Sequence, residues 1–86
     1  MNIPILKTKR LILREFRESD LDAYAEMSSD GEVMRYLGTG KVLSRAESWR
    51  SMAAIIGHWY FRGYGLWAVE EQQSGEMIGR IGCWKP

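Results

Sequence analysis

The stretch RGYG, residues 62–65, matches the first four positions of a strand motif with which proteins read RNA. Later positions of that motif carry aromatic side chains that stack on bases, but Leu66 and Val69 occupy two of them. A predicted helix also precedes the stretch, where the motif requires a strand. The formal net charge is +1, so the chain offers little electrostatic attraction to nucleic acid. An RNA-binding module is therefore kept only as an alternative, and no nucleic-acid partner is expected.

Two further stretches have the glycines of phosphate-binding loops. In GTGK, residues 38–41, the Walker pattern would need a glycine at Arg35 and a serine or threonine at Val42. The stretch GYGLWA, residues 63–68, fits a dinucleotide fingerprint, which must follow a strand and open a helix. Here the order is reversed, because a predicted helix precedes it and a predicted strand follows. Neither stretch is expected to bind a nucleotide.

Few side chains have the chemistry of catalysts or metal ligands. The chain has one histidine, His58, and one cysteine, Cys83, too few for a zinc cluster of the usual kind. Several glutamates stand in patterns typical of solvated faces. They are Glu26, Glu32, Glu47, Glu70, Glu71 and Glu76. We therefore assign no catalytic, cofactor-binding or metal-ligating residue from the sequence.

Cysteine content and hydropathy bear on location. With a single cysteine, no disulfide forms within the chain, which fits a reducing compartment. No segment approaches the roughly 20 apolar residues that a membrane helix needs. We expect a cytoplasmic protein without a membrane partner.

The candidate side chains must be held by a few elements in one domain, residues 1–86. The apolar run at residues 11–13 predicts a first strand, and SDLDAYAEMSSD, residues 19–30, predicts a helix. Residues 65–71 and 76–84 predict two strands joined by a turn. With a second helix between, the order is β-α-α-β-β. It predicts an α+β fold, a three-stranded antiparallel sheet with two helices packed on it.

The second helix has the clearest signals, over residues 45–62. Ser44 and Glu47 form a capping box, and Gly63 is placed to end the helix. Apolar residues at three- and four-residue steps predict its buried face. This stripe comprises Ala46, Trp49, Ala53, Ile56 and Tyr60, widened by Met52 and Trp59.

Four stretches stand in a characteristic order: TKRLILR at 8–14, DGEVMRYLG at 30–38, GYGLWAVEE at 63–71 and GEMIG at 75–79. Together they resemble the amino-terminal half of a GCN5-related N-acetyltransferase. The likeness covers nearly the whole chain and is greatest to the branch that acetylates ribosomal-protein N-termini, antibiotics and polyamines. It implies an acyltransferase that moves acetyl from acetyl-CoA to a primary amine.

The resemblance also implies missing parts. Complete family members are about twice as long, and continue into a strand and a glycine-rich turn whose N–H groups hold the coenzyme pyrophosphate. We therefore expect residues 1–86 alone to be an N-acetyltransferase domain without its acetyl-CoA-binding half. Such a chain would be inactive and bind no cofactor. A non-enzymatic interaction module is the alternative to an enzyme.

Two expectations about partners follow from the same resemblance. The family builds part of its acceptor-substrate wall between the first two helices. The corresponding residues here are Arg35, Tyr36, Leu37, Gly38 and Thr39. Ordinary helix-end packing and a surface loop would explain the same residues. The last strand, residues 76–84, lacks its family neighbour, so a homo-oligomer through this exposed edge is expected.

Overall fold

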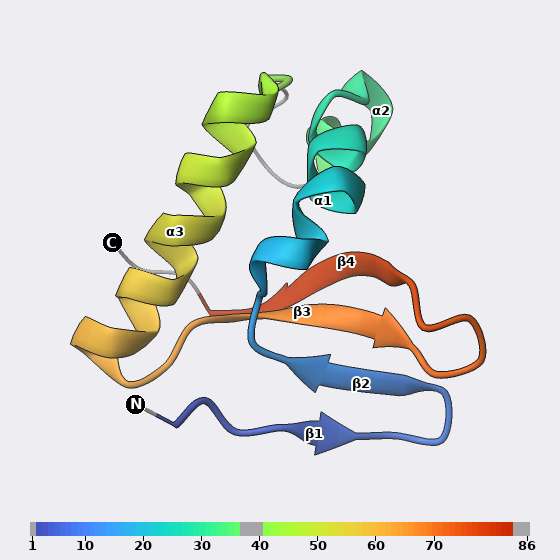
Figure 1. The fold of residues 1–86 in the computed structure, drawn as a ribbon, viewed down its shortest axis with the longest axis vertical. Coiled ribbons are helices and arrows are strands. Elements are labelled where there is room, and N and C mark those ends of the chain that lie inside the picture. The colour runs from blue at the N-terminus through green and yellow to red at the C-terminus, as the bar shows by residue number, and fades with distance from the viewer. Residues whose placement is uncertain (1, 37–40, 84–86) are drawn as a thin grey trace.

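The computed structural model describes residues 2–36 and 41–83, an antiparallel sheet with helices packed on it (Figure 1). The elements follow the chain as β1 (Leu6–Lys7), β2 (Leu11–Arg14), the 3₁₀ helix η1 (Glu18–Asp20), α1 (Leu21–Ser28), α2 (Gly31–Tyr36), α3 (Arg45–Arg62), β3 (Leu66–Glu71) and β4 (Met77–Gly82). The predicted α+β fold is confirmed.

The sheet has four strands in the order β1-β2-β3-β4, each antiparallel to its neighbours. The prediction of three strands is corrected by β1, in which Leu6 pairs with Leu13 and Lys7 with Ile12. A strand of two residues is too short to show the alternation by which strands are found in a sequence. The prediction of two helices is also corrected, because α2 forms a short third α-helix.

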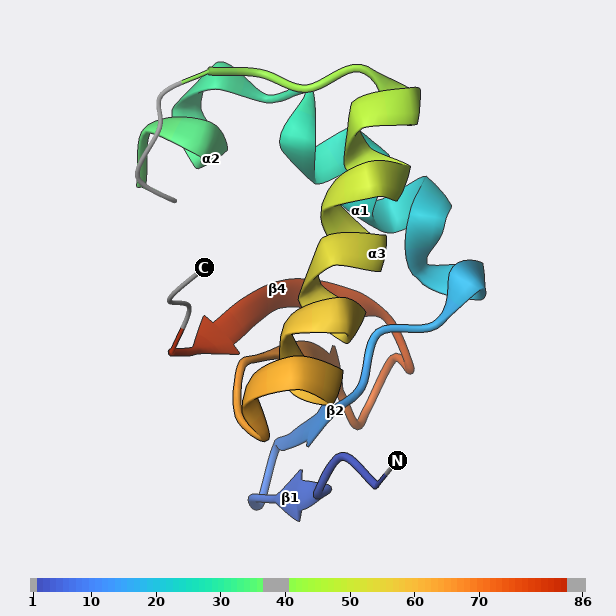
Figure 2. The same cartoon turned by 90° about the vertical axis from the view of Figure 1, so that its left-hand side faces the viewer.

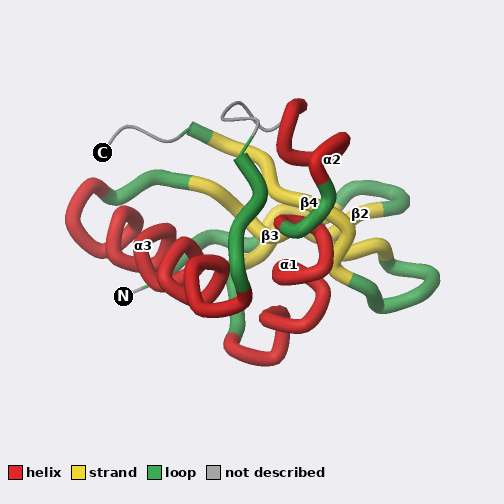
Figure 3. The backbone as a smooth tube through the Cα atoms, turned by 90° about the horizontal axis from the view of Figure 1, so that it is seen from above, coloured by secondary structure: helices red, strands yellow, loops and turns green. Residues whose placement is uncertain are grey.

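The core lies between the sheet and helices α1 and α3, which pack side by side against the same face of the sheet (Figures 2 and 3). Tyr24 of α1 and Ile55 of α3 are fully buried in one cluster with Ala68 of β3 and Met77 of β4. Burying a large apolar side chain contributes about 1.5–3 kcal/mol. These contacts therefore hold both helices on the strands.

The ends of α3 are those predicted. The Ser44 hydroxyl accepts a hydrogen bond from the Glu47 N–H at 3.1 Å, and the Glu47 carboxylate accepts one from the Ser44 N–H at 2.9 Å. Gly63 follows with φ of 77°, and its N–H donates to the Trp59 carbonyl at 2.9 Å. A left-handed backbone of this kind favours glycine. The helix ends there, so RGYG begins as a helix terminus and not as an RNA-reading strand.

The buried face of α3 is shifted by about one position along the chain from the predicted stripe. Its buried side chains are Ser48, Met52, Ile55, His58 and Trp59. Trp49 is 47% exposed and Tyr60 is 69% exposed. Two neighbouring rows of α3 both have helical spacing, and periodicity alone does not choose between them. The row that packs on the sheet includes Met52 and Trp59, which were predicted to lie only at the margin of the buried face.

Candidate functional site

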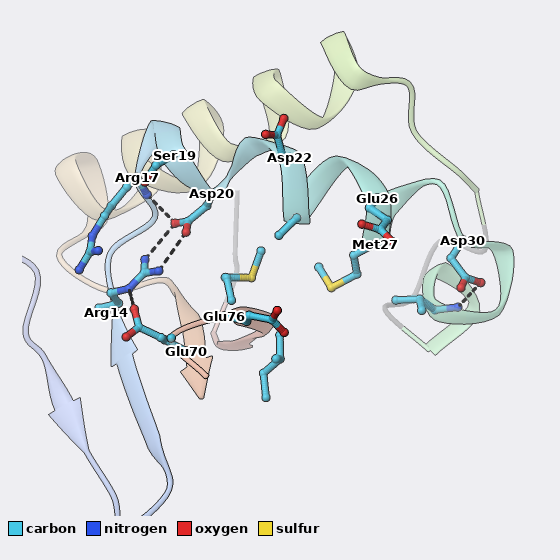
Figure 4. Close-up of a pocket in the computed structure, with 15 residues that line it drawn as sticks. Arg14, Arg17, Ser19, Asp20, Asp22, Glu26, Met27, Asp30, Glu70 and Glu76 are labelled. Atoms are coloured by element: carbon cyan, nitrogen blue, oxygen red, sulfur yellow. Dashed lines mark hydrogen bonds and ion pairs between the residues drawn. The ribbon is translucent and has the colours of Figure 1, made fainter. Parts of the chain in front are cut away.

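A pocket of about 750 Å³ lies between the η1–α1 segment and the β3–β4 hairpin (Figure 4). Its lining residues are Arg14, Arg17, Ser19, Asp20, Asp22, Ala23, Glu26, Met27, Asp30, Val33, Glu70, Gly75, Glu76, Met77 and Ile78. Six of them carry carboxylates and two carry guanidinium groups, a formal excess of four negative charges. A hollow with this lining attracts cations and repels anions.

The pocket is anchored by a buried ion-pair network around Arg14, which is 4% exposed. Two Arg14 nitrogens donate to the two carboxylate oxygens of Asp20, each at 2.9 Å. The Arg14 Nε donates to Glu70 at 2.8 Å, and Nη1 also donates to the Glu15 carbonyl at 2.9 Å. Figure 4 shows the contacts of Arg14 with Asp20 and Glu70, which join β2, η1 and β3.

The register of the sheet explains how Arg14 meets Glu70. Arg14 pairs with Ala68 and Ile12 pairs with Glu70, so Arg14 and Glu70 are diagonal neighbours on the helix-facing side. A diagonal neighbour is within reach of a long arginine side chain. β2 therefore positions the Arg14 guanidinium group, and the turn from β2 into η1 places Asp20 in contact with it.

Asp20 is held as a carboxylate. Burial raises the pKa of Asp20, but hydrogen bonds from Arg14 and from the Arg17 N–H outweigh it, so the pKa lies below its ordinary value. The Arg17 N–H lies 2.8 Å from the Asp20 oxygen. The hydrogen bond to Asp20 likewise raises the pKa of Arg14 against the opposing effect of burial. Both groups are thus charged across the physiological range.

The remaining carboxylates of the pocket differ in their contacts. Asp22 forms an exposed ion pair with Arg45, and Asp30 accepts from the Glu32 N–H at 2.9 Å at the start of α2. In the described part of the chain, the carboxylates of Glu26 and Glu76 make no hydrogen bond or ion pair. These two groups keep their full capacity to accept hydrogen bonds from a ligand.

A bulge in β4 supplies the apolar part of the lining. Val69 pairs with Gly79, but Glu70 pairs with Met77, so Ile78 is an extra residue in β4. Successive strand residues normally point to opposite faces. The bulge breaks this alternation, and both Met77 and Ile78 line the pocket.

Of the predicted substrate residues, the structure describes Arg35 and Tyr36, and neither of them lines this pocket. Arg35 and Tyr36 end α2, where Arg35 forms an exposed ion pair with Glu32 at 2.6 Å and Tyr36 is exposed. Val33, on the same helix, does line the pocket. Leu37, Gly38 and Thr39 lie outside the described residues. The assignment of Arg35–Thr39 to substrate binding therefore stays a prediction.

The buried network was missed at the sequence level. The prediction that Glu70 lies on a solvated face is wrong, because its side chain is 18% exposed and bonded to Arg14. One signal was present: Arg14 continues a strand whose alternation turns it toward the helices. A buried arginine requires carboxylate partners. Asp20 and Glu70 are the partners found.

The described residues form neither a metal-binding cluster nor a membrane-spanning helix. Among residues 2–36 and 41–83, no three or more His, Cys, Asp or Glu side chains are grouped to hold a metal ion. None of the helices there has the length and apolar character required to cross a membrane.

Comparison with known proteins agrees with the fold. Residues 10–86 match the model of the acetyltransferase (GNAT) domain. The chain is 38% identical over 80 residues to a Bacillus subtilis protein named uncharacterized N-acetyltransferase YoaA, covering 92% of this chain and 45% of that protein.

Two solved structures share the same architecture. A crystal structure of an acetyltransferase from Agrobacterium tumefaciens matches all of this chain and 49% of its own, with a TM-score of 0.77 and 30% identity. A GnaT-family acetyltransferase from Bordetella pertussis matches 93% of this chain and 46% of its own, with a TM-score of 0.73 and 26% identity. The chain thus spans about half the length of these relatives.

Proposed function

We propose, from the premise that this chain belongs to the acetyltransferase (GNAT) family, that its acidic pocket receives the amine acceptor of an acetyl transfer from acetyl-CoA. The observation that carries the proposal is the excess of carboxylates in a hollow with an apolar wall. A primary amine is protonated near neutral pH and is attracted to such a surface. The acceptor class remains a protein N-terminus, a polyamine or a small-molecule amine.

The proposed role of the pocket residues is binding and orientation. The carboxylates of Glu26 and Glu76 would accept hydrogen bonds from the ammonium group. Met77 and Ile78 would contact the carbon chain that carries it. Holding the amine in one place lowers the entropic part of the barrier to acyl transfer. When bound, acetyl-CoA supplies the activated thioester.

The described residues do not fit acetyl-CoA in this pocket. Its pyrophosphate is anionic and is best held by unpaired backbone N–H groups or by cationic side chains. The two guanidinium groups, Arg14 and Arg17, face six carboxylates, and Arg14 is already committed to Asp20 and Glu70. The cofactor would therefore need residues other than those that line the pocket.

We propose accordingly that residues 1–86 by themselves neither bind acetyl-CoA nor transfer acetyl. The support is the poor fit of the pocket to an anion, and the fact that the chain spans about half the length of its relatives. Isothermal titration calorimetry with acetyl-CoA tests this part, with no heat of binding expected. A dissociation constant in the micromolar range would overturn it.

The amine part has a separate test. Titration with 1,4-diaminobutane, followed by NMR of methionine methyl groups, should shift Met77 and Met27, both of which line the pocket. The change Glu76→Gln should weaken these shifts, since it removes a carboxylate of the pocket. Glu32→Gln is the matched control, because Glu32 lies outside the lining. Shifts that are absent, or equally weakened by both changes, would contradict the proposal.

A cytoplasmic location is also part of the proposal. It is supported by the single cysteine and by the similarity to a bacterial N-acetyltransferase. Fractionation of cells that express the chain, followed by immunoblotting, would test it. Recovery in the membrane or secreted fraction would contradict this location.

A further inference from the structure

A second hollow, of about 260 Å³, lies between α3 and the segment that leads from β2 into η1. Its lining residues all fall between positions 16 and 56, so β3 and β4 contribute none of them. It shares only Arg17 with the acidic pocket. The hollow is therefore a separate site, and its size suits a ligand smaller than a drug-sized molecule.

The wall of this hollow is an apolar row of α3. Trp49, Ala53 and Ile56 recur there at four- and three-residue steps and belong to the stripe that periodicity predicted to be buried. Because the neighbouring row packs on the sheet instead, Trp49 and Ala53 are exposed and Ile56 is half-buried. The buried side chains of Phe16 and Met52 complete the apolar lining. The hollow thus offers an apolar surface that the core does not use.

Two opposite charges stand side by side at this hollow. Arg17 and Glu18 are exposed and both belong to its lining. Within residues 2–36 and 41–83, the Arg17 guanidinium makes no hydrogen bond or ion pair, and Figure 4 shows it pointing away from Glu26 and Glu76 of the acidic pocket. The Glu18 carboxylate accepts one long hydrogen bond, from the Trp49 indole N–H at 3.4 Å. Both charges can therefore contact a ligand.

We propose that this hollow binds a free apolar α-amino acid. The carboxylate of the amino acid accepts hydrogen bonds from the Arg17 guanidinium, whose fork of N–H groups matches a carboxylate. Its ammonium group donates to the Glu18 carboxylate. Its side chain packs against Trp49, Ala53 and Ile56 and loses its contact with water. The two charges of an α-amino acid sit on neighbouring atoms of one carbon, as those of the site sit on neighbouring residues.

The charges favour this ligand over other apolar molecules. An apolar carboxylate without an ammonium group would meet the like charge of Glu18, and an apolar amine without a carboxylate would meet that of Arg17. A residue inside a peptide carries neither charge and would leave both side chains unpaired. A zwitterion is complementary to both. The inference is independent of the proposed acetyl transfer, because Glu26, Glu76 and Met77 take no part in it.

Titration of the 86-residue chain with L-phenylalanine tests the chemistry of the ligand. NMR should show saturable shifts of the Met52 methyl group and the Trp49 indole N–H, with a dissociation constant of about 1 mM for so small a ligand. The Met77 methyl group, in the acidic pocket, should not shift. Phenylalaninamide and N-acetylphenylalanine, which each lack one charge, should bind at least about threefold more weakly. Glycine, which lacks the side chain, should shift neither signal.

Variants test the place of binding. Ala53→Phe fills the hollow and should abolish the shifts of Trp49. Ala54→Phe is the matched control, because Ala54 is the next exposed residue of α3 and does not line the hollow. Arg17→Gln should weaken binding by about threefold, whereas Arg50→Gln, at an exposed residue outside the lining, should leave it unchanged.

Circular dichroism establishes that each variant folds. Absence of shifts with L-phenylalanine overturns the proposal, as does N-acetylphenylalanine binding as tightly as the free amino acid. Retention of binding in Ala53→Phe, or an equal loss in Ala54→Phe, also overturns it. Because the signals of Met52 and Met77 report on different hollows, a failure here is distinguishable from a failure of the proposed amine site.

Discussion

Arg14 and Asp20 form a buried two-point ion pair, with both guanidinium–carboxylate contacts at 2.9 Å. The pair fixes the path of the chain from β2 into η1. It does so in the interior, where an isolated charge is costly. The stability of the pocket wall therefore requires that both Arg14 and Asp20 are present.

Removing one partner of the Arg14–Asp20 ion pair should greatly reduce the free energy of unfolding. Asp20→Ala leaves Arg14 with Glu70 as its remaining carboxylate, and the free energy of unfolding should fall by about 3–5 kcal/mol. Asp22→Ala removes an exposed ion pair with Arg45 and should cost less than about 1 kcal/mol. Urea unfolding followed by circular dichroism compares the two. Equal losses would show that the buried pair has no special role.

The ion pair of the Asp20 carboxylate also leads us to expect a loss of stability in acid. The pKa of Asp20 is lower in the folded chain than in the unfolded chain. A lowered pKa contributes stability that is present above the unfolded value, about 3.9, and is lost as pH falls through the folded value. The urea concentration at the midpoint of unfolding should therefore decrease when the pH is lowered below about 4. In Asp20→Asn this part of the pH dependence should be missing.

Gly82 should tolerate no side chain. Its φ is 138°, and an added Cβ would lie 2.3 Å from the Gly65 carbonyl oxygen. Gly82→Ala should reduce stability by more than about 2 kcal/mol, since backbone strain and a backbone clash add. At Gly79 an added Cβ meets no atom within 4 Å, so Gly79→Ala should change stability by less than about 1 kcal/mol. Thermal unfolding of both variants gives the comparison.

The start of α3 depends on the Ser44 side chain. Ser44→Ala removes the acceptor for the Glu47 N–H and should lower stability by about 1 kcal/mol. Ser44→Asp keeps an acceptor oxygen at this position and should retain the stability of the parent chain. If both variants lose the same stability in urea unfolding, the cap is not the cause.

The parts of the fold governed by local chemistry could be predicted from the sequence. The bounds of α3 follow from Ser44, Glu47 and Gly63, whose effects act within one helical turn. The β3–β4 hairpin follows from two apolar runs around a glycine turn. Both were found because each signal lies beside the element that it shapes.

The parts of the fold that depend on contacts between residues far apart in the sequence could not be predicted. β1 exists only because β2 lies beside it, and the face of α3 was chosen by the sheet rather than by its own periodicity. The partnership of Arg14 with Glu70 joins residues 56 positions apart, so neither side chain alone reveals the other. Arg35 and Tyr36 were suggested by family resemblance and not by a contact that the sequence reveals, and their role in substrate binding stays a prediction.

The pairing of β2 with β3 has a consequence for the growing chain. β2 ends at Arg14, and its partner β3 begins only at Leu66, after all the helices in the described part of the chain. During synthesis the amino-terminal hairpin of β1 and β2 must therefore wait until residue 71 has left the ribosome before its inner edge is covered. The α1–α3 pair is complete before β2 gains this partner. A stalled chain ending at residue 64 would expose that inner edge and the Arg14 charge together.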